Sequence, residues 1–78
     1  MLKFKRADSG YYRAVRSDGE CVATIEHGAQ RGCCAPSEWL VTLRQWCPIV
    51  EAWTGYAGEI VGSYREGRAV AERHAAQD

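Results

Sequence analysis

The side chains in this sequence that could carry out chemistry are four cysteines and two histidines. The cysteines are Cys21, Cys33, Cys34 and Cys47, and four cysteines allow three disulfide pairings. A bridge between the neighbours Cys33 and Cys34 would strain the peptide that joins them. The first ten residues lack the apolar core of a secretory signal, so we expect a cytoplasmic location, where thiols stay reduced.

A structural zinc ion is an alternative use of the same residues. Four ligands of suitable type are available at Cys21, His27, Cys33 and Cys47, and Cys34 could join or replace its neighbour. The sequence has no Cys-x-x-Cys pair, the usual device that presents two thiolates to one ion. We therefore expect no metal and no cofactor, and we keep a zinc-stapled interaction module as an alternative.

Catalysis by a thiol needs a base near the nucleophile and a third group that orients the base. His27 is close to Cys33 in the sequence, but no third group is evident. The glycines at Gly55, Gly58 and Gly62 do not form a phosphate-binding loop, because no Lys-Ser or Lys-Thr follows them. The sequence therefore predicts that the protein is not an enzyme.

Aromatic and acidic side chains gather in the middle of the chain. A domain of 78 residues can hardly bury every one of them, and exposed Trp and Tyr side chains often anchor protein interfaces. Packing of the whole aromatic cluster in the core is the alternative. The residues that we expect to contact a partner are Glu38, Trp46, Glu51, Trp53, Tyr56 and Glu59.

The net charge of the chain is zero, which argues against a general nucleic-acid binder. The charge is unevenly distributed, however, because residues 1–16 carry +4 and residues 17–64 carry −4. The basic segment is either a solvated sheet face or a surface for phosphates. In the second case the nucleic-acid-binding residues would be Lys3, Lys5, Arg13 and Arg16.

The elements that must position these residues begin with three short strands. Residues 2–7 alternate between apolar and charged side chains, which is the period of a half-buried strand. Residues 11–16 and 21–26 are rich in aromatic and β-branched types or alternate in the same way. Asp18-Gly19 lies between them and favours a tight hairpin. The pattern predicts a three-stranded antiparallel meander.

The next part of the chain fits two templates. Residues 27–36 are expected to form a loop. From residue 37 to 53 the aromatic spacing fits a helix capped by Ser37, but Pro48 would break that helix and the β-branched content favours a strand. We prefer a strand over residues 38–44, followed by an irregular or edge segment over 45–57.

A last strand over residues 59–63 leads into the one helix whose start is clearly marked in the sequence. Ser63 and Glu66 have the spacing of a capping box, in which each side chain satisfies a free backbone N–H of the first turn. A thin stripe of small residues must then lie on a sheet. The members of this stripe are Gly67, Val70, Ala71, His74 and Ala75. The sequence therefore predicts one α+β domain over residues 1–78, in which an antiparallel sheet of three to five strands packs against a C-terminal helix.

Two stretches carry a resemblance to known proteins: YYRAVRSDGECVATIEH, and GSYREGRAVAERHA at the start of the helix. This order of strands and helix resembles the arm-type DNA-binding domains of phage integrases, which implies a sheet that enters the major groove. It also looks like many small phage and prophage proteins, and anti-CRISPR proteins are similar in size and in their lack of catalytic motifs. The resemblance implies an accessory protein of phage or mobile-element type, connected with host defence.

We therefore expect an inhibitor that binds and blocks a larger host protein or nucleoprotein complex. DNA binding through the basic N-terminal hairpin is the alternative. No stretch of the sequence approaches the roughly 18 apolar residues that cross a bilayer, so we expect no membrane partner. A homodimer formed through the helix or a sheet edge is compatible with each of these functions.

Overall fold

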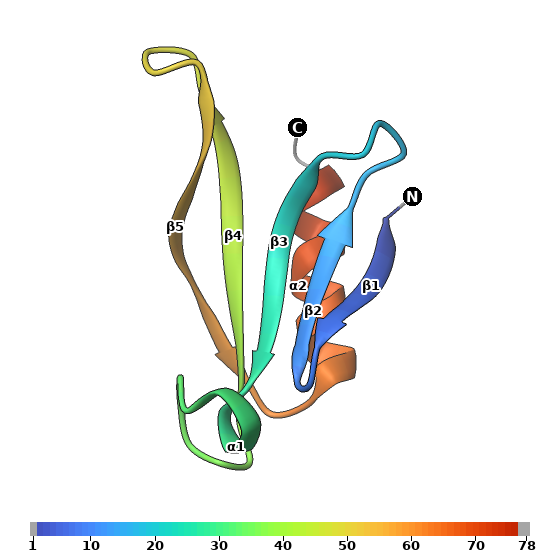
Figure 1. The fold of residues 1–78 in the computed structure, drawn as a ribbon, viewed down its shortest axis with the longest axis vertical. Coiled ribbons are helices and arrows are strands. Elements are labelled where there is room, and N and C mark those ends of the chain that lie inside the picture. The colour runs from blue at the N-terminus through green and yellow to red at the C-terminus, as the bar shows by residue number, and fades with distance from the viewer. Residues whose placement is uncertain (1, 77–78) are drawn as a thin grey trace.

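The computed structural model describes residues 2–76, apart from the side chains of residues 56 and 57. The described residues form one five-stranded antiparallel sheet in the order β1-β2-β3-β4-β5, with a long helix on one face (Figure 1). The α+β prediction is therefore confirmed. The elements are β1 (Lys3–Asp8), β2 (Tyr11–Val15), β3 (Cys21–His27), α1 (Gly28–Arg31), β4 (Trp39–Cys47), β5 (Ala52–Val61) and α2 (Tyr64–Ala76).

The N-terminal meander forms as its alternating pattern predicts. β1 pairs with β2, and β2 pairs with β3, both antiparallel. In the turn between β2 and β3, Gly19 has a φ of 93° and its N–H donates to the Arg16 carbonyl at 2.9 Å. Asp18 Oδ1 accepts the Glu20 N–H at 2.9 Å. This Asp-Gly turn fixes the register between the two strands.

The C-terminal half of the sheet corrects three predictions. Residues 45–57 are mainly strand, because β4 continues to Cys47 and β5 begins at Ala52. The last strand is therefore Ala52–Val61 rather than 59–63, and the helical alternative for residues 37–53 is wrong. Pro48 lies in the turn between the two strands, where the N–H that proline lacks is not needed for the ladder.

A β-bulge in the pair β4–β5 explains why the sequence pattern does not predict the full length of β5. The register shifts between Val41, opposite Glu59, and Leu43, opposite Tyr56. Between these two pairs, β4 therefore advances by two residues while β5 advances by three. Within this stretch the backbone of Gly58 approaches β4 so closely that a Cβ would collide with the Val41 carbonyl oxygen. Glycine is thus required here by close packing of two strands.

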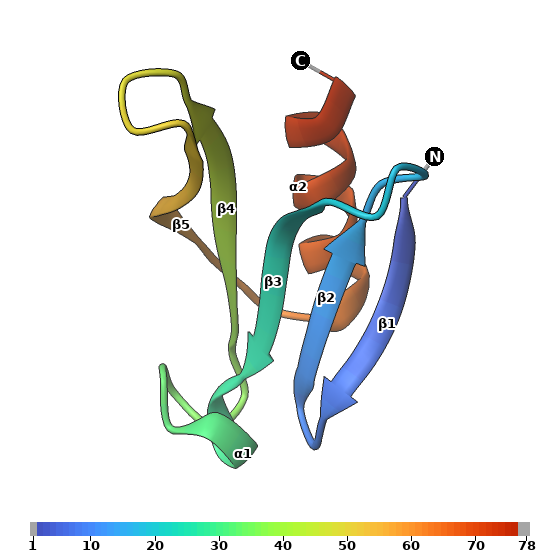
Figure 2. The same cartoon turned by 45° about the horizontal axis from the view of Figure 1, so that its top comes forward.

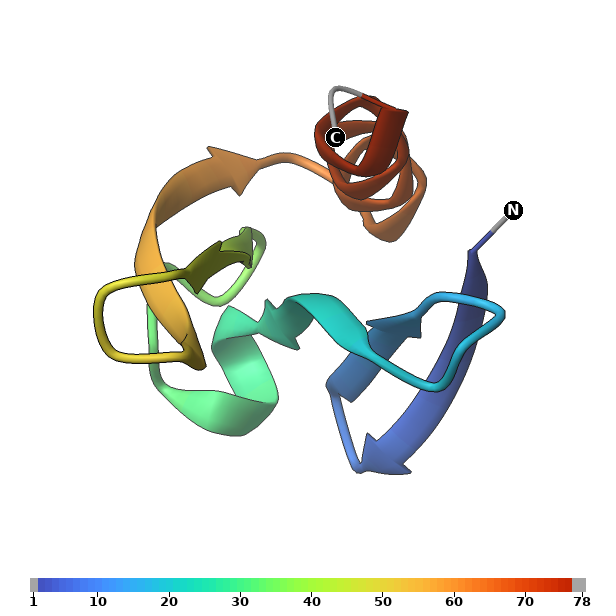
Figure 3. The same cartoon turned by 90° about the horizontal axis from the view of Figure 1, so that it is seen from above.

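The helix α2 lies against the concave face of the sheet, over β3 and β4, as Figures 2 and 3 show. Ser63 caps it, since the Ser63 Oγ accepts the Glu66 N–H at 3.1 Å. Of the predicted stripe, Gly67, Val70 and Ala71 are buried. A Cβ on Gly67 would lie 3.2 Å from methyl groups of both Ile25 and Val41. The small residues therefore let helix and sheet approach closely.

The core consists of two neighbouring groups of side chains between α2 and the sheet. One is centred on Ile25, Val41 and Val70, and the other on Val22, Ala23 and Ala71. The partly buried His74 ties α2 to β4, because its Nε2 lies 2.7 Å from the Arg44 carbonyl oxygen. The convex face of the sheet is left without a covering layer among the described residues (Figure 3).

The segment 27–36, expected to be a loop, contains the one-turn helix α1. This short helix has no side-chain cap and ends at Gly32, which has a left-handed φ of 70°. Gly28 is buried directly beneath the carbonyl oxygens of Cys34 and Ala35. Backbone packing, rather than any local sequence signal, therefore fixes this turn.

Candidate functional site

The tip of the β4–β5 hairpin presents three of the four large apolar side chains that are exposed among the described residues, and the fourth, Ile60, lies near the far end of β5. Ile49 is 91% exposed, Val50 is 60% exposed and Trp46 is 49% exposed. Ile49 and Val50 lie in the turn, and Trp46 stands opposite Trp53 at its base. In Figures 1 and 2 the hairpin extends away from α1, and its tip is separate from α2. We call residues 46–53 the hairpin tip.

The base of the hairpin tip is ordered by its two tryptophans. The rings of Trp46 and Trp53 are 6.1 Å apart in an edge-to-face arrangement. Trp53 packs against the core group that contains Val22, and the Arg16 guanidinium lies 5.6 Å from its ring centre. Arg44 donates to the Trp53 carbonyl oxygen at 3.5 Å. The tip therefore stands on a fixed aromatic base and carries its aliphatic side chains outward.

The structure brings together only part of the predicted contact set. Trp46, Glu51 and Trp53 share the hairpin tip, where Glu51 has a positive φ of 50° in the turn. Glu38 lies beside α1, and its Oε1 accepts the Ala35 N–H at 3.2 Å. Glu38 and the tip are thus at opposite ends of β4. The predicted contact of the Tyr56 side chain lies outside the described residues.

Glu59 occupies a third position. Glu59 lies on β5, where it pairs with Val41 of β4, and it borders a shallow groove of about 380 Å³ between the sheet and α2. The groove is also lined by Arg73 and His74 of the helix. Sequence reasoning missed Ile49 and Val50. The signal that could have found them is an apolar pair directly after Pro48, at a point where the alternation of the strand stops.

The basic residues of the N-terminal hairpin lie mostly on the convex face. The register places Lys5 opposite Arg13, and the same row continues through Thr24 and Thr42. Lys3 shares this face by alternation, and all three basic side chains are exposed. Arg16 differs, because its side chain lies at Trp53 and 4.0 Å from the Asp18 carboxylate. We call Lys3, Lys5 and Arg13 the basic face.

The third tryptophan is part of the packed structure. Trp39 stacks on His27 at 4.3 Å and lies 5.5 Å from Tyr64 at the start of α2. Tyr12 lies 4.5 Å from Tyr64. Burial raises the pKa of the Tyr64 hydroxyl, the nearby Tyr12 raises it further, and the positive charge of Arg68 opposes this rise. The alternative that the aromatic residues serve packing thus holds for Trp39.

The alternative zinc set is not brought together. Cys21 begins β3 and His27 ends it, so about six residues of extended strand, roughly 20 Å, separate them. Cys47 ends β4, whereas Cys33 lies beside α1. Within residues 2–76, with the exceptions already given, no group of three or more His, Cys, Asp or Glu residues is placed to hold a metal ion. The four cysteines are free thiols.

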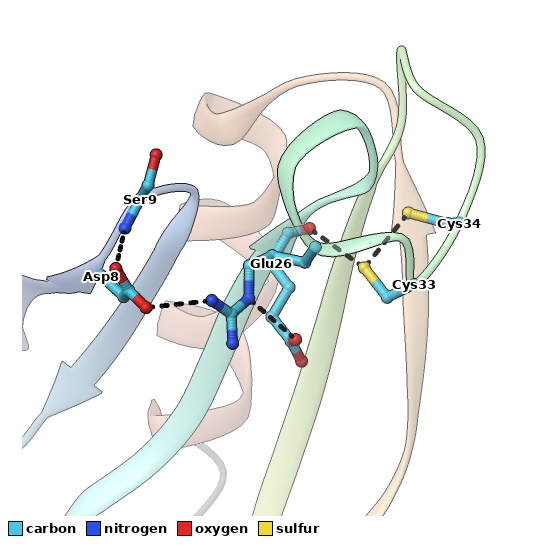
Figure 4. A network of polar contacts seen from close by, with 6 residues as sticks. Asp8, Ser9, Glu26, Cys33 and Cys34 are labelled. Carbon is cyan, nitrogen blue, oxygen red and sulfur yellow. Dashed lines mark hydrogen bonds and ion pairs between the residues drawn. The ribbon is translucent and has the colours of Figure 1, made fainter.

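The α1 end of the sheet holds a network of polar contacts (Figure 4). Arg31 pairs with the Asp8 carboxylate at 3.2 Å and lies 3.9 Å from the Glu26 carboxylate. The Ser9 N–H donates to Asp8 Oδ1 at 2.7 Å, and this bond, together with the charge of Arg31, lowers the pKa of Asp8. The network ties the β1–β2 turn to α1.

Comparisons with known proteins return no match: no family model, no curated protein and no solved structure matches the chain. In the part of the chain that the structure describes, no helix is both long and apolar enough to cross a membrane.

Proposed function

We propose that this protein is a small, non-enzymatic accessory protein that acts by binding a larger protein or nucleoprotein complex through the hairpin tip. The observation that carries the proposal is the exposure of Ile49, Val50 and Trp46 at the end of a projecting hairpin. Large apolar side chains grouped on a surface are typical of protein interfaces. Because Trp46 and Trp53 already order the base of the hairpin, binding would require little additional ordering.

Glu51 in the same turn adds a negative charge to the apolar tip. We therefore propose that the partner presents an apolar cleft with a basic rim, such as a protein surface that normally holds nucleic acid. Occupying this surface would block it, which is the inhibitory action implied by the likeness in type to anti-CRISPR proteins. A phage or mobile-element context belongs to the same proposal.

A second candidate function is binding of a nucleic-acid backbone on the basic face. Like charges placed directly opposite in a sheet, as Lys5 and Arg13 are, destabilise it. An anionic ligand would relieve this repulsion. This candidate predicts an affinity that falls steeply with salt, with a log–log slope of about −0.9 for each phosphate contacted.

One experiment tests both functions. Tagged wild-type protein is compared, in pull-downs from a host lysate with and without nuclease, with a tip variant (Ile49→Ser with Val50→Ser) and a face variant (Lys5→Gln with Arg13→Gln). The proposal expects a partner that survives nuclease, is retained by the face variant and is reduced at least about tenfold with the tip variant. Both variants change exposed side chains, so the urea midpoints should stay close to wild type.

A partner that the tip variant retains and that nuclease or the face variant removes would overturn the hairpin-tip proposal and favour the second candidate. Loss of the partner with either variant alike, without a change in stability, would show that the two surfaces work together on a nucleoprotein complex. The apolar tip would then be the protein-binding half of that contact.

A further inference from the structure

Two neighbouring thiols lie side by side next to α1. The Sγ atoms of Cys33 and Cys34 are 3.7 Å apart, and both residues are half-buried (Figure 4). The Cys33 thiol also lies 3.8 Å from the Glu26 carbonyl oxygen, which can accept its proton in a hydrogen bond. This is a pair of thiols in contact, at a surface that reagents can reach.

The loop that carries the two thiols is held by backbone hydrogen bonds. Gly28 N–H donates to the Glu38 carbonyl at 2.8 Å, and Glu38 N–H donates to the Ala35 carbonyl at 2.9 Å. The Glu38 side chain accepts the Ala35 N–H as well. The loop thus keeps the two sulfur atoms near each other without a bond between them.

The distance between the two sulfur atoms suits a single atom that bonds to both of them better than it suits a disulfide bond. A sulfur–sulfur bond of about 2.05 Å would require the two atoms to close by about 1.7 Å and would strain the peptide between adjacent cysteines. A soft centre with two bonds of roughly 2.3 Å, meeting at about a right angle, holds its two sulfurs about 3.3 Å apart. That arrangement needs about 0.4 Å of movement from the observed distance.

The charge around the pair limits which ligand fits. Partial burial raises the pKa of the Cys34 thiol, and the hydrogen bond with Cys33 and the negative charges of Glu38 and Glu26 raise it further. The Cys34 thiol therefore stays protonated at neutral pH, which slows its attack on a disulfide. A trivalent arsenical condenses with two neutral thiols to give a neutral product, and it is a soft centre that prefers sulfur.

We propose that Cys33 and Cys34 form a chelating site for a trivalent arsenical. With phenylarsine oxide as the probe, arsenic forms one bond to each sulfur, and the two thiol protons leave with the oxide oxygen as one molecule of water. Arsenic stays trivalent and no electrons are transferred. The site is independent of the hairpin tip and of the basic face.

The test is intact mass spectrometry of reduced protein after addition of one equivalent of phenylarsine oxide and then a large excess of a monothiol. A chelate survives the monothiol, whereas an adduct held by one sulfur is removed. We expect one surviving adduct in wild type and in the control Cys47→Ser, and none in Cys33→Ser or Cys34→Ser. Urea midpoints of the two serine variants establish that both remain folded.

Glu38→Gln serves as a second, milder variant, because its amide oxygen can still accept the Ala35 N–H while the charge is removed. The arsenical adduct should persist in this variant, since the condensation creates no charge. The proposal is overturned if wild type gives no surviving adduct, if either serine variant keeps it, or if Cys47→Ser loses it. It is equally overturned if a low-molecular-weight disulfide bridges Cys33 to Cys34 more readily than the arsenical does.

Discussion

At the scale of single residues, Gly67 decides how closely α2 approaches the sheet. Its Cβ position lies 3.2 Å from methyl groups of Ile25 and Val41. The methyl group of alanine would meet a tight contact that offsets the roughly 1 kcal/mol that alanine gains over glycine in a helix. For a larger side chain the gain in helix propensity does not offset the steric cost, because the side chain must displace Ile25 and Val41, which are both fully buried.

Gly67→Val should therefore destabilise the protein by about 1–3 kcal/mol through overpacking. The measurement is the free energy of unfolding in urea. Ala69→Val is the matched control, since Ala69 is exposed on the same helix and its replacement should cost only about 0.5 kcal/mol of helix propensity. Equal losses in the two variants would mean that Gly67 is not a close contact point.

Some of these residue roles could be predicted from the sequence. The spacing of Gly67, Val70 and Ala71 indicates the buried stripe, and alternation alone places Lys3 and Lys5 on the face opposite Phe4. The exposure of Ile49 and Val50 could not be predicted, because apolar residues are normally assigned to a core. Their exposure depends on where the turn falls between β4 and β5.

At the scale of elements, the chain has two serines that look like helix caps, and only one begins a helix. The Ser63 Oγ accepts the Glu66 N–H, whereas Ser37 precedes the strand β4. Ser63→Ala should lower the free energy of unfolding by about 1 kcal/mol, because a first-turn N–H loses its partner. Ser37→Ala is the comparison and should change it by less than about 0.5 kcal/mol, as measured from urea midpoints.

The strand β5 shows where local sequence patterns stop being informative. Thr54-Gly55-Tyr56-Ala57-Gly58 has the composition of a loop, since glycine is unfavourable in strands. Pairing with β4 on both sides of the bulge outweighs that preference, and the close approach at Gly58 requires glycine. The helix α1 escaped prediction for a related reason, because a buried backbone contact at Gly28 holds it in place.

At the scale of the whole molecule, the pKa of Tyr64 links the packing of α2 on the sheet to pH. The pKa of this hydroxyl is raised above its ordinary value of 10.0, so the folded state holds the proton more tightly than the unfolded state. The unfolded chain therefore loses its proton first, and stability decreases as the pH rises above about 10. Below that pH the contribution is fully present.

We expect the wild type to lose more free energy of unfolding between about pH 9 and pH 11 than Tyr64→Phe does. Both proteins contain the other tyrosines and lysines, so the difference between them isolates Tyr64. The measurement is a pair of urea titrations at each pH. An identical loss in the two proteins would show that Tyr64 ionises as freely in the folded protein as in the unfolded chain.

The two outer strands of the sheet differ in a way that bears on aggregation. β1 carries Lys3, Lys5 and Arg6, whose charges oppose the addition of another strand, whereas the ten residues of β5 include only Glu59 as a charged residue. Any pairing between copies would therefore join β5 to β5 about a twofold axis. Such contact covers the less charged edge of both molecules and leaves only the basic β1 edges, whose charges oppose further growth into a fibril.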